Sequence, residues 1–225
     1  MSELNTVVIV GSSLAGLRAA ETLRLEKYEG RIIIVGAEDR QPYDRPPLSK
    51  KVLSGEWEAD RISLRKPDDL AKLNIDWKLG SAATALDTTN HTIALASGET
   101  IAFDGLIIAT GSGVRKLPNQ PDWTGVHVVR TLDDSLALRA DLNPGARVVV
   151  IGAGFIGLEV AATAKARGCE VIVLEGAPAP MMRGLGADMG HAAALVHADN
   201  GVAMRFNVKV LDLLKAVRVQ WAAWH

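Results

Sequence analysis

The sequence predicts an α/β fold, because the pattern strand, glycine-rich turn, helix and strand occurs twice in it. Thr6–Val10 and Arg31–Val35 are short, mainly apolar runs on either side of a helical pattern at Leu14–Leu25. Apolar strands without polar alternation are typical of parallel sheets that are covered on both faces. The pattern returns at 147–174, so we expect two βαβ units.

The second unit is expected to begin with a strand at Arg147–Ile151 and a helix at Phe155–Arg167. Gly168 is placed to stop that helix, and Glu170–Leu174 is the next strand. The two units start too far apart in the chain to belong to a short solenoid repeat. They are interpreted as two nucleotide-binding halves.

The region between the two units mixes parallel and antiparallel signals. Gln41–Lys51 is a loop rich in proline and charge, and Asp68–Leu73 is helix-like. Glycine and proline at Gly111–Asn119 indicate a crossing between domains, with a second joint at Pro144–Gly145. We therefore expect domains at 1–112 and 113–225. The short strands expected before the crossing are Ile75–Leu79, His91–Leu95, Thr100–Phe103 and Gly105–Ala109.

Patterns after Glu175 are weaker. Met189–His197 is helical in pattern, and Gly201–Phe206 has the pattern of a third strand. The apolar run at 208–219 has no clean period, and the tail to His225 fits no element.

Composition excludes several functional classes. The 225 residues carry 25 Lys plus Arg and 26 Asp plus Glu, which gives a net charge of -1 and no basic surface for nucleic acid or an anionic membrane. No targeting segment is visible, so we expect a cytoplasmic protein. Cys169 is the single cysteine, and the five histidines have no ligand spacing, so neither a disulfide nor a metal site is expected.

The second glycine cluster has the full context of a dinucleotide fingerprint. Gly152, Gly154 and Gly157 follow a strand and open a helix, and Glu175 ends the next strand. These glycines suit a tight turn, close approach of a pyrophosphate and close packing of helix on strand, and the helix N-terminus favours anions. A carboxylate at Glu175 can accept ribose hydroxyls and repels a 2'-phosphate, which favours NADH over NADPH. The structural alternative is a glycine-rich turn that binds no ligand.

The first cluster, Gly11-Ser12-Ser13-Leu14-Ala15-Gly16, has Ser13 in place of the central glycine. A serine Cβ crowds the place where a pyrophosphate approaches the backbone. The βαβ pattern around it is nevertheless intact, and Glu38 follows the second strand. A nucleotide site is therefore predicted here too.

Four segments resemble, in order and spacing, the FAD-dependent ferredoxin and rubredoxin reductases of the pyridine nucleotide-disulfide oxidoreductase superfamily. They are Pro42–Lys50, Leu106–Gly111, Arg130–Asp134 and Gly152–Glu159, and the resemblance covers about residues 5–207. It implies two Rossmann-like FAD/NAD(P)-binding domains, with FAD and NADH as cofactors. It also implies electron transfer to a ferredoxin or rubredoxin that serves an oxygenase system.

The resemblance also implies roles for individual residues. Lys50 and Glu159 are expected to form a catalytic ion pair, with Lys50 beside the flavin. From the charge pattern alone, Lys50 would be an ordinary solvated lysine, and Glu159 would be an acid that interacts favourably with the helix dipole. The single cysteine excludes the dithiol chemistry of the superfamily's disulfide reductases. The residues implied to bind FAD are Gly11, Ser13, Ala15, Gly16, Glu38, Arg45, Lys50, Thr110, Gly111 and Arg130; those implied to bind NADH are Gly152, Gly154, Gly157 and Glu175.

The chain departs from this family after residue 207. The reductases are roughly twice as long, so the FAD domain is expected to be incomplete, and Leu211–His225 fits a truncated gene product or a shifted reading frame. Three hypotheses remain open: a reductase or its N-terminal portion, a non-catalytic remnant that retains nucleotide binding, and a nicotinamide-binding module that needs a partner chain.

Overall fold

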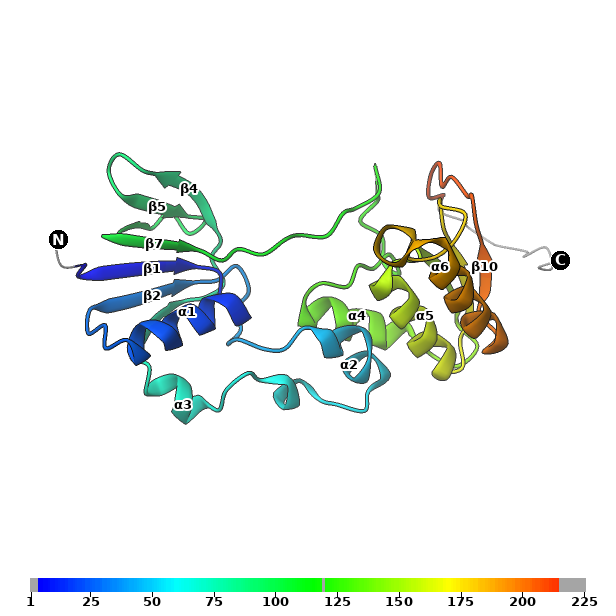
Figure 1. Ribbon diagram of the computed structural model, residues 1–225, viewed down its shortest axis with the longest axis horizontal. Coiled ribbons are helices and arrows are strands. Elements are labelled where there is room, and N and C mark those ends of the chain that lie inside the picture. Colours follow the sequence, from blue (N-terminus) through cyan, green and yellow to red (C-terminus); the bar gives the residue numbers. More distant parts are fainter. Residues whose placement is uncertain (1–3, 119, 215–225) are drawn as a thin grey trace. The chain divides into compact units, whose positions relative to one another are not determined.

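The computed structural model describes residues 4–118 and 120–214, which divide into two compact units (Figure 1). The first unit contains the chain up to Arg45 together with Glu58–Gly113. The second contains Pro46–Trp57 and the chain from Val114 onward. The expected division at 112 and 113 lies beside the observed change of unit, but Pro46–Trp57 belongs to the second unit.

The first unit is built on a four-stranded parallel sheet. Its strands are β1 (Thr6–Val10), β2 (Arg31–Val35), β3 (Ile75–Lys78) and β7 (Gly105–Ile108), in the order β3-β2-β1-β7. The helix α1 (Leu14–Leu25) connects β1 to β2, as the sequence predicts. The carboxyl ends of β1, β2 and β7 therefore meet at one edge of the sheet.

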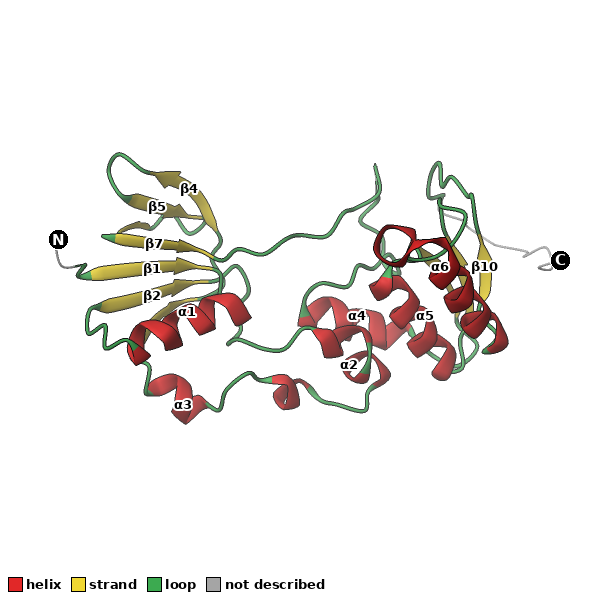
Figure 2. Ribbon diagram, viewed as in Figure 1, coloured by secondary structure: helices red, strands yellow, loops and turns green. Residues whose placement is uncertain are grey.

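An antiparallel sheet covers the face of the parallel sheet opposite α1 (Figure 2). It consists of β4 (Ala83–Asp87), β5 (Thr92–Leu95) and β6 (Thr100–Ala102). Val8 and Ile33 pack with Ile93 on this side, while the alternate strand residues pack toward α1. This layering explains why β1 and β2 are apolar on both faces. The connection from β2 to β3 also contains η2 (Ala59–Ile62) and α3 (Pro67–Ala71).

The second unit repeats this plan with fewer strands. Its parallel sheet has the order β10-β9-β8, with β8 (Arg147–Ile151), β9 (Glu170–Leu174) and β10 (Ala203–Arg205). The helix α5 (Phe155–Ala166) connects β8 to β9, and α4 (Leu132–Asp141) precedes β8. Buried side chains of α4, α5 and β9 form one core.

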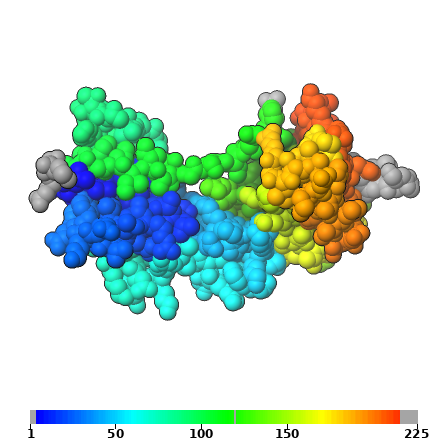
Figure 3. All heavy atoms as spheres, viewed as in Figure 1, coloured from blue at the N-terminus to red at the C-terminus, as the bar shows by residue number. Residues whose placement is uncertain are grey.

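The helix α6 (Met182–Asp199) contains the helix expected at 189–197 and leads to β10. Gly186 interrupts it with φ 78°. The helix α6 lies on the surface of the second unit (Figure 3). Some of its apolar side chains are exposed, among them Met189 at 57% and Leu195 at 66%. The part of the C-terminal tail from residue 215 onward lies outside the described residues.

The segment Pro46–Trp57 forms η1 (Pro46–Ser49) and α2 (Lys51–Ser54) rather than an open loop. It packs against α4 and α5 (Figure 1), and Leu53 belongs to the core of the second unit. Side chains of those helices bind its backbone carbonyls. The donor and acceptor pairs are Ser135 to Leu48, Thr163 to Ser49, Arg139 to Val52 and Arg167 to Ser54.

Three further elements and one joint differ from expectation. The 3-10 helix η2, the strand β4 and the helix α4 were not predicted; α4 begins with a capping box in which Thr131 accepts a hydrogen bond from Asp134 N. Pro144–Gly145 was expected to join the two domains, which is wrong. Gly145 N donates to Gly168 O at 2.9 Å, and the pair makes the turn from α4 to β8 inside the second unit.

The outer strand β8 differs from β1 in its burial. Within the described residues β8 is the edge of its sheet, and Val149 and Ile151 on one face are 47% and 40% exposed. Val148 and Val150 on the other face pack against the core. An exposed apolar edge strand is a surface prone to association.

Replacing Val149 with Lys should therefore lower self-association, because a charge on an edge strand opposes pairing with another copy. Leu25→Lys is the control, since it adds the same charge at an apolar side chain of the first unit that is 78% exposed. Light scattering over a range of concentrations should show less association for Val149→Lys only. Equal behaviour of the two variants would contradict this role of β8.

Candidate functional site

Each unit places a glycine at the turn that follows its first strand, as predicted. Gly11 has φ 126° and Gly152 has φ 97°, a region that side chains rarely adopt. Gly11 N donates to Val35 O and Gly152 N to Leu174 O, each at 2.8 Å. Both turns are thus fixed to the end of the neighbouring strand.

The third glycine of each cluster lies against the first. A Cβ added to Gly16 would be 1.9 Å from Gly11 O, and one added to Gly157 would be 2.1 Å from Gly152 O. Only glycine allows this approach of helix to strand. Around Gly154, in contrast, no heavy atom lies within 4 Å of an added Cβ. The middle position of the second fingerprint is therefore open to a ligand.

The two fingerprint helices begin without a side-chain cap. Ser13 and Gly154 hold the N-cap positions of α1 and α5, and neither residue caps its helix through a side-chain hydrogen bond. The helix α4, which belongs to no fingerprint, has the Thr131 capping box. Uncapped N-terminal amides and the helix dipole favour an anion such as a phosphate.

Glu175 lies at the end of β9 and reaches the fingerprint turn. Its Oε2 accepts a hydrogen bond from Ala153 N at 2.6 Å, and its Oε1 accepts one from Ala177 N at 2.8 Å. The carboxylate is thus held at the carboxyl edge of the sheet beside Gly152. Each oxygen retains acceptor capacity for a further hydroxyl.

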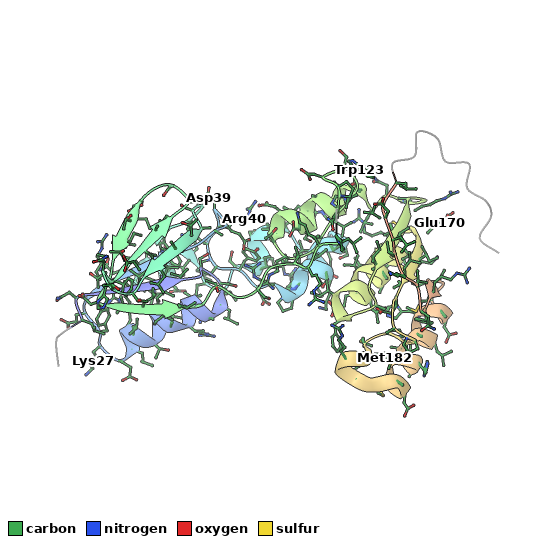
Figure 4. The ribbon with its side chains drawn as sticks, turned by 90° about the horizontal axis from the view of Figure 1, so that it is seen from above. Lys27, Asp39, Arg40, Trp123, Glu170 and Met182 are labelled. Atoms are coloured by element: carbon green, nitrogen blue, oxygen red, sulfur yellow. The ribbon has the colours of Figure 1, made fainter. Side chains whose placement is uncertain are left out.

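Glu38 of the first unit has a cationic partner. Arg45 Nη2 lies 2.6 Å from Glu38 Oε1, and Tyr43 also donates its hydroxyl to this carboxylate. The Arg45 guanidinium stacks over the Tyr43 ring at 5.1 Å, and its Nε is 3.4 Å from Ser13 Oγ. The structure therefore brings Ser13, Glu38 and Arg45 together at one edge of the sheet. In Figure 4, Asp39 and Arg40 mark this edge and Lys27 the opposite one.

Thr110 and Gly111 follow β7 at the same edge. A Cβ added to Gly11 would lie 2.0 Å from Ala109 O and 3.1 Å from Thr110 N. Ala15 is exposed in the first turn of α1. The FAD-assigned residues of the first unit lie in the fingerprint turn and α1 or after the ends of β2 and β7, while Lys50 and Arg130 belong to the second unit.

Lys50 and Glu159 form the expected ion pair within the second unit. Lys50 Nζ lies 2.7 Å from Glu159 Oε2, and the two side chains are 48% and 33% exposed. Ser49 Oγ donates to the same carboxylate oxygen at 2.6 Å. The charged ends meet as predicted, and the pair remains accessible to solvent.

Arg130 lies next to the capping box of α4, and its backbone N donates to Asp134 Oδ2 at 3.0 Å. A pocket of about 370 Å³ lies nearby, lined among others by Lys116, His127 and Asp134. None of the residues predicted to bind a nucleotide lines this pocket. It therefore does not coincide with either fingerprint.

Other chemistry finds little support in the described residues. No group of three or more His, Cys, Asp or Glu residues there could hold a metal ion. Cys169 is buried, and burial raises the pKa of its thiol, which disfavours a reactive thiolate. Among these residues, no helix is both long and apolar enough to cross a membrane.

The sequence gives no indication of the hydroxyl groups that form hydrogen bonds at the segment before Lys50. Ser49, Ser135 and Thr163 are ordinary residues in sequence, and no spacing rule connects segments this far apart in the chain. Only the positions of Glu159 and Thr163, one helical turn apart, indicate a shared face of α5.

Residues 5–218 match the family model described as pyridine nucleotide-disulphide oxidoreductase. The match extends beyond residue 207, where the resemblance was expected to end. The ferredoxin–NAD(+) reductase component of the p-cumate 2,3-dioxygenase system of Pseudomonas putida is 37% identical over 219 residues, 97% of this chain and 54% of that protein. The corresponding component of the biphenyl dioxygenase system of Paraburkholderia xenovorans (strain LB400) is 40% identical over 188 residues, 83% of this chain and 46% of that protein.

Two solved structures are similar in fold and sequence. The covalent putidaredoxin reductase–putidaredoxin complex matches with a TM-score of 0.88 and 34% identity, over 95% of this chain and 52% of that chain. The ferredoxin reductase for the CYP199A2 system from Rhodopseudomonas palustris matches with a TM-score of 0.88 and 36% identity, over 95% and 53%. The chain thus spans about half the length of the relatives that it matches.

Gly157→Ala should destabilise the second unit by about 1 to 3 kcal/mol, because its Cβ would overlap the Gly152 carbonyl and force helix and strand apart. Gly154→Ala is the matched control and should cost less than about 1 kcal/mol, since its surroundings are open and its φ is -74°. Urea denaturation followed by circular dichroism measures both. A Gly157→Ala variant as stable as the unmodified chain would refute the close packing.

Proposed function

Since the chain belongs to the pyridine nucleotide-disulphide oxidoreductase family, we propose that it provides the NADH site and part of the FAD site of an NADH:ferredoxin oxidoreductase. The observation that carries this proposal is the second fingerprint, complete within one unit. Gly152, Gly154, the uncapped α5 and Glu175 all lie at one edge of the sheet.

These residues fit NADH by their donors and acceptors. The α5 N-terminus offers amides to the pyrophosphate, and the space at Gly154 allows its close approach. Glu175 is fixed by two backbone amides, so its carboxylate is held in place before binding, which supports the proposed contact with ribose hydroxyls. The same negative charge disfavours the 2'-phosphate of NADPH.

The first unit supports a proposed site for the adenosine and pyrophosphate of FAD, with different contacts. Glu38 occupies the acid position, and Arg45 beside Ser13 adds a cation where an anionic pyrophosphate would approach α1. Arg130, Thr110 and Gly111 are proposed as further FAD contacts. A bound flavin would accept hydride and pass electrons on singly, chemistry that no side chain of this chain supplies. Lys50 and Glu159 would orient groups and set charge beside it.

The electron acceptor is proposed to be a ferredoxin or rubredoxin. This rests on the relatives, which are named as reductase components of dioxygenase systems, and on the reductase solved as a complex with putidaredoxin. We further propose a cytoplasmic location, which the single cysteine supports.

One observation favours a second candidate function, an NADH-binding module without reductase turnover. All the residues proposed for NADH lie in the second unit, whereas those proposed for FAD are divided: Lys50 and Arg130 belong to the second unit and the others to the first. NADH binding therefore depends on the stability of one unit only. We expect the chain to bind NADH better than FAD.

Glu175→Ala should weaken NADH binding by about 1 to 3 kcal/mol, because a charge-assisted contact to the ribose is lost. Glu170→Ala is the control: this acid begins β9, at the opposite end of the strand from Glu175, and is 63% exposed. Isothermal titration with NADH and NADPH measures both variants and the unmodified chain. Tighter binding of NADPH than of NADH by the unmodified chain would overturn the assignment.

The absorbance spectrum of the purified chain with added FAD, followed by anaerobic NADH titration, distinguishes the two candidate functions. A module without turnover should retain little flavin and show little bleaching. Stoichiometric flavin that bleaches promptly with NADH would show a competent reductase and would reject the second candidate.

A further inference from the structure

Ser49 is a buried polar residue beside the Lys50–Glu159 ion pair. Its exposure is 4%, and among the described residues Ser135 is the only other buried polar residue. A buried hydroxyl is costly unless it is hydrogen-bonded. Ser49 satisfies this requirement by donating to Glu159 Oε2 at 2.6 Å, the same oxygen that Lys50 contacts.

The backbone on both sides of the Ser49 side chain is held in place. Ser135 Oγ donates to Leu48 O at 2.6 Å, and Thr163 Oγ1 donates to Ser49 O at 2.9 Å. Thr163 lies one turn after Glu159 on α5, so a single helix face both anchors Ser49 and receives its hydroxyl. These two bonds hold the backbone at Leu48 and Ser49, whereas the Ser49 hydroxyl makes its own, separate bond to Glu159.

The two partners of Glu159 differ in how firmly they are held. Lys50 Nζ also donates to Pro46 O at 3.1 Å, but this bond and the ion pair are both exposed, and the side chain is 48% exposed. Exposed ion pairs gain little free energy, because water competes and the long side chain loses entropy. The Ser49 hydroxyl is shielded from water, and a hydrogen bond to a carboxylate is stronger in such surroundings. The serine is thus the firmer partner.

We propose that Ser49 is a positioning residue that fixes the Glu159 carboxylate independently of Lys50, which leaves the lysine as the member of the pair that can move. This rests on the proposed function, because it is for the proposed redox site that the pair's geometry matters. With the Glu159 carboxylate fixed and the Lys50 ammonium able to move away, a nucleotide could approach the pair while the carboxylate keeps its position.

The first test measures how well Lys50 is protected, without any nucleotide. Trace acetylation with acetic anhydride, read by mass spectrometry, gives the reactivity of Lys50 relative to Lys51, which has the same 48% exposure. Ser49→Ala should raise this ratio about two- to five-fold, the range expected when an exposed ion pair is lost. Ser49→Thr, which keeps the hydroxyl, should restore a low ratio.

Ser135→Ala is the matched control, because it removes a buried hydroxyl from the neighbouring carbonyl without touching Glu159. It should leave the ratio unchanged. In a Glu159→Gln background, Ser49→Ala should add nothing, since its effect runs through the carboxylate. A rise with Ser135→Ala equal to that with Ser49→Ala would show a merely structural role and overturn the proposal.

Crystal structures of two variants complete the test. In Lys50→Met the Glu159 carboxylate should stay within hydrogen-bond distance of Ser49 Oγ, and in Ser49→Ala it should be displaced. The reverse pattern would assign the positioning to Lys50 instead. Because none of these measurements contains NADH or FAD, failure of the nucleotide titrations would reject the proposed function and leave this result standing.

Discussion

The contact between the third fingerprint glycine and the carbonyl of the first is the constraint on which each unit depends. In the second unit, Gly157 against Gly152 O fixes the position and rotation of α5 on β8. That rotation places Glu159 and Thr163 toward the segment Pro46–Trp57 and the small residues of α5 in the core. A Cβ at Gly157 would thus disturb the ion pair as well as the turn.

The two units obey the same constraint but differ in what covers their sheets. In the first unit β1 lies between β2 and β7 and beneath the antiparallel sheet, so its Val7 to Ile9 are at most 3% exposed. In the second unit the described residues supply neither a strand beyond β8 nor a layer over Val149. The apolar sequence of β8 is therefore that of a strand buried on both faces, although only one of its faces is packed here.

The sequence predicts the strands, helices and glycine turns where one local pattern decides the outcome. Arg147–Ile151 and Gly152 belong to this group, because periodicity and the need for positive φ act within a few residues. Pro46–Trp57 does not, since its charge and prolines are typical of a loop. Its short helices form because side chains of α4 and α5, far away in sequence, satisfy its carbonyls. Long-range contacts of this kind have no signature in a single sequence.

The same distinction applies to the sites. Glu175 could be assigned from spacing because strand, turn and acid are consecutive, and the structure holds it at the turn through two main-chain amides. The Lys50–Glu159 pair could be anticipated only from the family resemblance, since 109 residues separate its members. Ser49 escaped both routes, because a serine beside a lysine carries no signal until its burial is known. Its bond to Glu159 follows from burial, because a buried hydroxyl needs a hydrogen-bond acceptor within the protein. The Glu159 carboxylate that accepts this bond is then held in place when the Lys50 side chain moves.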